Sequence, residues 1–279
     1  MKQIEELGLK CKNKTFTIAE IGLNHGGDIN LAIDMIDSAV RAGADSVKFQ
    51  TYLTEKRVKK DSPIFEILKK CELSFESFKI LKDYSEKLGV IFFSTPFDEE
   101  SIDYLESINV ELYKIASFDL VNKVMLKKIE STKKPIILSV GMSEITEIKD
   151  ALEILKPSLN KIALLHCISA YPTQEYDANL SAINTLKKEF PHCIIGQSDH
   201  TNGIKIPIYS VAAGSQIIEK HFKISEDMEC VDSPVSISEL QFKQMVSEIR
   251  DLEKIMGNGI PHLTQAQEGT KQYRRFTNL

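Results

Sequence analysis

Two histidines follow two short apolar runs in the second half of the chain. His200 lies four residues beyond the run 194–196, and His221 lies three residues beyond the run 216–218. Both runs are rich in isoleucine and too short for helices, so we expect strands with the histidines at their carboxyl ends. Neutral imidazole is a common metal ligand, and two imidazoles on neighbouring strand ends can share one divalent ion. Alternatively, each histidine is satisfied separately by its own hydrogen bonds.

Polar and charged side chains stand at the end of nearly every other apolar run as well. In chain order these candidates are Glu20, Lys48, Gln50, Thr95, Lys114, Ser117, Ser139, His166, Ser169, Tyr171, Ser198 and Glu219. Two ammonium groups and a set of hydroxyls suit a small anion with several oxygens, such as a phosphate or a carboxylate. The structural alternative is that the lysines are buried in salt bridges to Glu20 or Glu219, and that the hydroxyls bond nearby backbone.

The composition argues against several classes of function. The 279 residues carry a formal net charge of −5, which gives no electrostatic footprint for nucleic acid or an anionic membrane. No apolar run approaches the roughly 18 residues of a membrane span, and the first residues lack the apolar core of a signal peptide. The five cysteines are odd in number and widely spaced, which suits reduced thiols. We therefore expect a cytoplasmic protein without nucleic-acid or membrane partners.

Eight strand-like runs alternate with segments of helical periodicity. The runs are 16–22, 46–52, 90–97, 112–118, 135–142, 161–169, 194–196 and 216–218. The helical segments include 31–44, 64–71, 75–88, 99–107, 121–131, 144–156, 178–189 and 236–257. Strands alternating with helices imply right-handed parallel crossovers, and eight such units in about 250 residues predict an α/β fold, a single (β/α)8 TIM barrel. The absence of GxGxxG after the first run argues against a dinucleotide-binding fold.

One domain accounts for nearly all of the chain. Residues 1–258 form the predicted barrel domain, and residues 259–279 are polar, weakly patterned and tail-like. A TIM barrel brings the carboxyl ends of its eight strands to one mouth, where its active sites lie. The strand-end candidates are therefore expected to meet there.

Eight segments resemble, in order, motifs of the N-acetylneuraminate (sialic acid) synthase family, which includes the legionaminic and pseudaminic acid synthases and spore-coat polysaccharide enzymes. The resemblance runs from about residue 14 to 279 and is specific, because the motifs are colinear. The segments are AEIGLNHGG (19–27), VKFQTY (47–52), FFSTPFD (92–98), YKIAS (113–117), ILSVGM (137–142), LLHCISAYPT (164–173), GQSDHT (196–201) and IEKHF (218–222).

The resemblance implies an enzyme that condenses phosphoenolpyruvate with an N-acetylmannosamine-type sugar, releasing phosphate and forming a nine-carbon 2-keto acid. Family members use a divalent ion, Mn²⁺ or Mg²⁺, and the resemblance implies a homodimer. It assigns the ion to His200 and His221. It places phosphoenolpyruvate on Lys48, Thr95, Lys114, Ser117, Ser139, Ser169 and Ser198. It places the sugar beside Glu20, Gln50, Tyr171 and Asp232. Either Glu20 or Glu219 is expected to handle the proton of the attacking water.

Two positions and one segment depart from the family pattern. Ser169 stands where sialic acid synthases typically have asparagine, and Ser233 replaces a histidine in the segment 230–236. The segment 259–279 resembles the linker to an antifreeze-like C-terminal domain, which is expected to be absent here. In the family, an arginine of that domain reaches the sugar site of the partner subunit.

Two alternatives remain open at this point. The first is another phosphoenolpyruvate-dependent aldol synthase, such as the 3-deoxy-octulosonate 8-phosphate class. Such enzymes use phosphorylated sugars and should show further basic residues for a second phosphate, and none is recognised at the strand ends. The second is a non-catalytic or regulatory partner of a full-length synthase. The acceptor sugar itself is not identified, because specificity is expected in loops such as 53–75.

Overall fold

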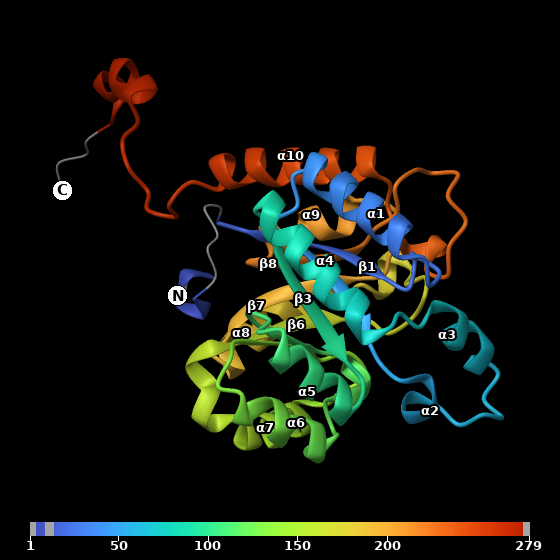
Figure 1. Cartoon of the computed structure of the whole chain (residues 1–279). Coiled ribbons are helices and arrows are strands. Elements are labelled where there is room, and N and C mark those ends of the chain that lie inside the picture. The colour runs from blue at the N-terminus through green and yellow to red at the C-terminus, as the bar shows by residue number, and fades with distance from the viewer. Residues whose placement is uncertain (1–3, 9–13, 276–279) are drawn as a thin grey trace.

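Eight parallel strands pair in chain order and close into a ring, with helices around it (Figure 1). The protein is described by a computed structural model, which covers residues 4–8 and 14–275. The predicted TIM barrel is confirmed. Its strands are β1 (Phe16–Gly22), β2 (Ser46–Thr51), β3 (Ile91–Pro96), β4 (Tyr113–Ile115), β5 (Ile136–Ser139), β6 (Ile162–Cys167), β7 (Ile194–Asp199) and β8 (Ile217–His221).

The helices follow from local sequence signals and cover the outside of the strands. α1 begins where the Asp28 carboxylate accepts from the backbone of Asn30 at 2.8 Å, and α4 ends at Gly89, whose φ of 75° is easy for glycine. The helices are α1 (Ile29–Arg41), α2 (Thr54–Arg57), α3 (Phe65–Cys71), α4 (Phe75–Leu88), α5 (Glu99–Ser107), α6 (Lys123–Ser131), α7 (Ile145–Ile154), α8 (Ala182–Glu189), α9 (Lys205–Ala212) and α10 (Glu239–Met256). The short helix α2 lies in a segment for which the sequence indicated only charge.

The inside of the barrel is apolar at its amino-terminal end. Phe16, Ile18 and Phe93 belong to one buried cluster there, and Leu7 of the short helix η1 (Ile4–Leu7) packs against the same cluster. A larger apolar cluster fills the space between the strands and the helices. Apolar side chains therefore close one end of the barrel, and the buried charged residues of the strands gather toward the other end.

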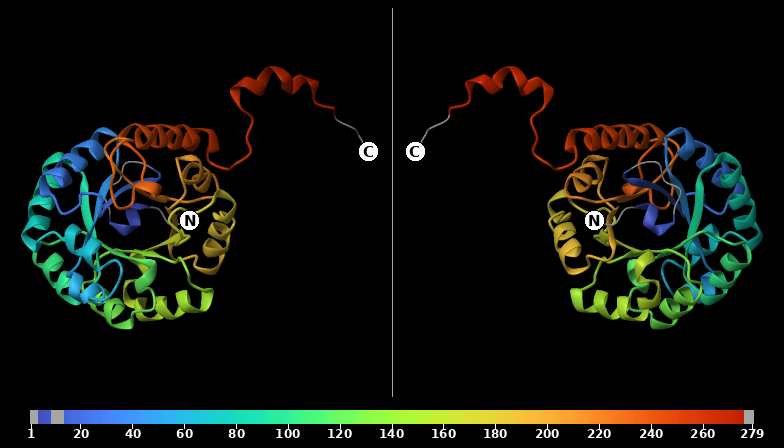
Figure 2. Two further views of the ribbon diagram at one scale, coloured as in Figure 1. Left: turned by 90° about the vertical axis from the view of Figure 1, so that its right-hand side faces the viewer. Right: turned by 90° about the vertical axis from the view of Figure 1, so that its left-hand side faces the viewer.

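The end-on views in Figure 2 show the segment after α10 leading away from the ring of helices. It contains a 3-10 helix, η6 (Gln265–Tyr273), and every residue from 257 to 275 is exposed. Its description as a linker, and the boundary at residue 258, stay predictions. Cys11 lies outside the described residues. Within the described ranges, no helix is long and apolar enough to cross a membrane.

His25 provides a test of the fold through pH. Burial lowers the pKa of His25 to about 4, and its Nδ1 accepts from the backbone of Gly27 at 3.1 Å. The pKa of His25 in the folded chain lies below its value of about 6.5 in the unfolded chain, so its contribution to the free energy of unfolding is complete above pH 6.5. As the pH falls from about 6.5 to 4, the free energy of unfolding decreases by about 3 kcal/mol because of this residue. Measured by urea unfolding across this range, the free energy of unfolding of the His25→Gln variant should depend less on pH than that of the parent chain. The control variant His262→Gln, changed at an exposed site, should show the same pH dependence as the parent chain.

Candidate active site

Four charged side chains from four strands meet inside the barrel mouth. The Lys48 Nζ atom lies 2.8 Å from Glu20 Oε2 and 3.6 Å from Glu219 Oε2. The Lys114 Nζ atom lies 3.8 Å from Glu219 Oε1. All four residues are buried. The salt bridges of the structural alternative are therefore present, and they lie at the catalytic face of the barrel, not at a remote position.

The surroundings shift the pKa values of the Glu20 and Glu219 carboxylates in opposite directions. Burial raises the pKa of Glu20 and the neighbouring Glu219 carboxylate adds to this, although Lys48 opposes both. Burial alone would also raise the pKa of Glu219, but Lys114 and Lys48 lower it well below its ordinary value. Such a divergence is typical of acid–base pairs in active sites. The surroundings thus favour the ionised form of Glu219 more strongly than that of Glu20.

Hydroxyl groups surround the lysines. Lys48 Nζ donates to Thr95 Oγ1 at 3.1 Å, and Lys114 Nζ donates to Ser139 Oγ at 2.6 Å. The Ser198 hydroxyl donates to Glu219 Oε1 at 2.8 Å. Ammonium groups and hydroxyls within one buried space can together bind an anion with several oxygens.

Gly141 marks a second part of the same space. Its backbone N–H donates to Ser117 Oγ at 3.0 Å. A Cβ atom at this position would lie 2.5 Å from Ser169 Oγ and 2.9 Å from Ser117 Oγ, which real Cβ contacts do not tolerate. Among the described residues, the buried Ser169 hydroxyl has no well-aligned hydrogen-bond partner, although it interacts with the Cys167 thiol. An unpaired buried hydroxyl is costly, so this hydroxyl is suited to a ligand.

We predict that Gly141→Ala weakens binding of the anionic substrate by about 10-fold or more, because the added methyl group displaces both serine hydroxyls. The backbone at Gly141 is not in the left-handed region, so the effect is steric. Gly269→Ala is the control, since its Cβ atom would meet nothing within 4 Å. Isothermal titration with phosphoenolpyruvate measures the difference, and equal affinity in the two variants would show that the serines do not contact the anion.

The two predicted metal-binding histidines lie side by side. The ring centroids of His200 and His221 are 5.4 Å apart, and Tyr171 lies over His200 with its centroid at 4.0 Å. His200 Nδ1 lies 2.7 Å from the carbonyl oxygen of Ile168, which only accepts, so Nδ1 carries the hydrogen and Nε2 keeps its lone pair. Burial lowers the pKa of His200 to about 3, so this ring is neutral, as a metal ligand must be.

His221 is oriented by a carboxylate. Its Nδ1 atom lies 3.3 Å from Asp232 Oδ2 and, within the described chain, has no well-aligned hydrogen-bond partner. Burial lowers the pKa of His221, but the Asp232 carboxylate opposes this and raises the pKa above its ordinary value. A carboxylate behind an imidazole is the usual arrangement for a metal-ligating histidine. No group of three or more His, Cys, Asp or Glu side chains suited to a metal occurs in the described parts of the chain, so the metal site on His200 and His221 stays a prediction.

Comparison with known proteins places the chain in a family. The NeuB family model matches residues 35–261. The chain belongs to the NeuB family. The resemblance to the sialic acid synthases is thereby confirmed, and the chain is a sialic acid synthase-like enzyme.

Individual relatives cover most of the NeuB-family chain. It is 48% identical over 246 residues to an uncharacterised protein of Methanocaldococcus jannaschii, covering 88% of this chain and 73% of that protein. It is 40% identical over 274 residues to the N,N'-diacetyllegionaminic acid synthase of Legionella pneumophila, covering 90% of this chain and 77% of the relative. The N-acetylneuraminic acid synthetase of Leptospira borgpetersenii, solved with citrate, superposes with a TM-score of 0.91 at 40% identity, covering 94% and 92% of the two chains.

Two strand-end residues of this NeuB-family chain, Asp199 and Lys220, have a structural role outside the mouth. Lys220 is fully buried, and its Nζ lies 2.7 Å from Asp199 Oδ2 and also donates to the carbonyl oxygen of Thr201. This ion pair joins β7 to β8 directly beside His200 and His221. It thereby fixes the separation of the two strand ends that carry the histidines.

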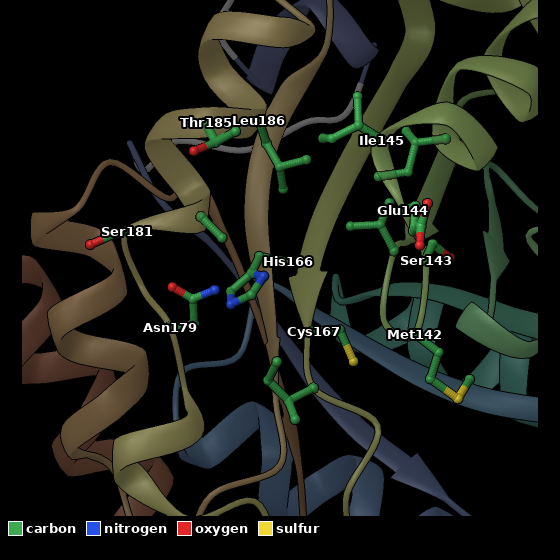
Figure 3. Close-up of a pocket in the computed structure, with 14 residues that line it drawn as sticks. Met142, Ser143, Glu144, Ile145, His166, Cys167, Asn179, Ser181, Thr185 and Leu186 are labelled. Carbon is green, nitrogen blue, oxygen red and sulfur yellow. The ribbon is translucent and has the colours of Figure 1, made fainter.

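His166 also faces away from the mouth. Its Nε2 atom donates to the carbonyl oxygen of Ala178 at 2.8 Å, and its ring lines a cavity of about 610 Å³ bordered by α7 and α8 (Figure 3). Figure 3 shows His166 near the centre of this cavity, with Asn179 on one side and Met142 on the other. The lysines and glutamates of the mouth do not line this cavity, so we place the chemistry in the barrel mouth.

One cation at the mouth of this NeuB-family chain, Arg57, was not predicted from the sequence. Arg57 Nη1 donates to Gln50 Oε1 at 3.0 Å, and Gln50 Nε2 donates in turn to Glu20 Oε1 at 3.2 Å. In the sequence, Arg57 is one of several basic residues in a charged stretch that also contains Lys56 and Lys59. The aromatic Tyr52 nearby is the only local signal that could have pointed to it.

Proposed function

We propose that this chain condenses phosphoenolpyruvate with the open-chain form of an N-acetylmannosamine-type amino sugar, giving a nine-carbon 2-keto acid and phosphate. The observation that supports this best is the juxtaposition of Lys48 and Lys114, set among hydroxyls, with a pair of imidazoles at adjacent strand ends. Membership of the NeuB family, with relatives named for sialic-type acids, supports the same conclusion.

In this mechanism the lysines hold the phosphate and carboxylate of phosphoenolpyruvate. Thr95, Ser139, Ser117, Ser169 and Ser198 supply the remaining hydrogen bonds. Preorganised charge in a water-poor site stabilises the developing charge of the transition state. Carbon 3 of phosphoenolpyruvate forms the new bond to the aldehyde carbon of the sugar, and water adds to carbon 2. Phosphate then leaves with cleavage of the carbon–oxygen bond, so one water is consumed for each phosphate released.

Glu20 is the group that we assign to the proton of the attacking water. Its raised pKa brings a carboxylate nearer to the range in which a general base is effective.

Tyr171, Gln50 and Asp232 border the side of the mouth assigned to the sugar. A divalent ion, Mn²⁺ or Mg²⁺, would be held by His200 and His221 and would supply Lewis-acid polarisation of the sugar aldehyde. The homodimer and the cytoplasmic location stay predictions.

A phosphate-release assay tests this function. Purified protein is incubated with phosphoenolpyruvate, Mn²⁺ and a panel of free and phosphorylated N-acyl hexosamines. We expect phosphate release only when a free amino sugar is present, with loss of activity after chelation of the ion. Strict dependence on a phosphorylated sugar would favour the 3-deoxy-octulosonate 8-phosphate class, and tight binding of phosphoenolpyruvate without phosphate release would favour a non-catalytic role.

A further inference from the structure

Arg57 is a half-buried cation at the barrel mouth for which the mechanism above has no use. Its guanidinium carbon lies 3.6 Å from the ring centroid of Phe97 and 4.7 Å from that of Tyr52. In residues 4–8 and 14–275, no carboxylate lies within salt-bridge distance of the guanidinium, and its one hydrogen bond is to Gln50. A guanidinium has five N–H donors, so most of its donors remain available to a ligand.

The neighbouring basic residues differ from Arg57 in this respect. The Lys56 ammonium lies 3.2 Å from Glu100, and the Lys69 ammonium lies 2.9 Å from Glu72. Both lysines are exposed and already paired. Arg57 is therefore the basic residue of this loop that is turned toward the mouth and held on aromatic rings without an ionic partner.

The hydrogen bond from Arg57 connects it to the part of the mouth assigned to the sugar. Because a guanidinium only donates, the amide oxygen of Gln50 must face Arg57, and its amide nitrogen must face Glu20. A Cβ atom at Gly22 would lie 3.1 Å from Glu20 Oε1, 3.3 Å from Asp232 Oδ2 and 3.4 Å from Gln50 Nε2. These three polar groups thus converge on one point, and Arg57 borders it through Gln50.

We propose that Arg57 recognises the acceptor sugar through an uncharged carbonyl oxygen, the oxygen of its acyl amide. This inference rests on the proposed function, and it adds a specificity-determining residue to the sugar side of the site. Arg57 presents the free edge of its guanidinium to that oxygen while its other edge holds Gln50 in place.

An uncharged oxygen fits better than a phosphate because of the charge around Arg57. Asp119, Asp232 and Glu20 all act on the guanidinium electrostatically. A sugar phosphate would meet this single cation among three carboxyl groups, whereas the phosphoenolpyruvate side offers two lysines with hydroxyls. Planar guanidinium recognition of a carbonyl oxygen needs no further positive charge.

The test compares Arg57→Leu and Arg57→Lys with Lys56→Leu, which removes a charge from the same helix. For an N-acyl hexosamine, Arg57→Leu should raise KM about 10- to 100-fold, with KM for phosphoenolpyruvate and the melting temperature unchanged. For the parent hexose without the acyl amide, kcat/KM should stay within about twofold of the parent enzyme. Arg57→Lys should recover part of the loss, and Lys56→Leu should behave as the parent enzyme.

Distinct results overturn the inference. Unchanged KM for the N-acyl hexosamine in Arg57→Leu, or equal losses for acylated and non-acylated sugars, would remove Arg57 from acyl recognition and leave the proposed function intact. A preference of the parent enzyme for the sugar 6-phosphate that disappears in Arg57→Leu would make the ligand a phosphate instead. An absence of turnover by the parent enzyme with every acceptor would overturn the proposed function, and the role of Arg57 with it.

Discussion

Replacement of Lys114 by methionine is expected to lower kcat/KM for phosphoenolpyruvate by about 100- to 1,000-fold while the barrel stays folded. The fold should survive because Glu219 keeps two other partners, Ser198 at 2.8 Å and Lys48 at 3.6 Å. Steady-state kinetics and thermal unfolding measured on the same preparation separate the two effects. Lys82→Met is the control, since Lys82 is a buried lysine that pairs with Glu86 on α4, outside the mouth.

Lys48→Met should lose activity to a similar extent and also lose stability. This change removes the only residue in salt-bridge distance of Glu20, at 2.8 Å, so far as the structure describes the chain. Breaking a buried ion pair by removing one partner costs about 3–5 kcal/mol. Lys114→Met with normal phosphoenolpyruvate affinity and turnover would contradict the assignment of the lysines to the anion.

Loss of either His200 or His221 is the second large effect that we expect. His200→Ala and His221→Ala should each weaken Mn²⁺ binding by more than the 10- to 100-fold that follows loss of an outer-shell partner. Electron paramagnetic resonance of free Mn²⁺ during a titration reports this binding without any need for turnover. Turnover should fall in parallel, because the ion is assigned to activation of the aldehyde.

His166→Gln is the matched control for this experiment. His166 also lies near the end of a strand, but its ring faces the cavity bordered by α7 and α8. The His166→Gln variant should bind Mn²⁺ with the same affinity as the parent chain. Equal loss in all three variants would point to a general effect on the fold, and unchanged Mn²⁺ affinity in His200→Ala and His221→Ala would contradict the metal assignment.

The strands and the strand-end residues could be predicted from the sequence for physical reasons. A strand buried on both faces is a short apolar run, and a TIM barrel brings all eight carboxyl ends together whatever the loops do. Glu20, Lys48, Lys114 and Glu219 therefore had to meet once the fold was predicted. The run 112–118 was too long, because the strand ends at Ile115 and Ser117 begins a 3-10 turn.

Contacts that depend on packing between distant segments could not be predicted. Arg57 became part of the mouth only because Phe97, forty residues later, supplies the ring on which it lies. The unsuitability of any side chain at Gly141 likewise depends on Ser117 and Ser169 reaching it from two other loops. The orientation of His166 away from the mouth depends on Ala178, which follows the strand in another segment.

The central claim is that the chain forms a carbon–carbon bond between phosphoenolpyruvate and an amino sugar. Mass spectrometry of the product from phosphoenolpyruvate labelled with ¹⁸O at the carbon–phosphate bridge tests it most directly. We expect a nine-carbon keto acid formed in equal amount with phosphate, and the label in the phosphate. Pyruvate in place of the condensed product, or label retained in the keto acid, would rule out this condensation.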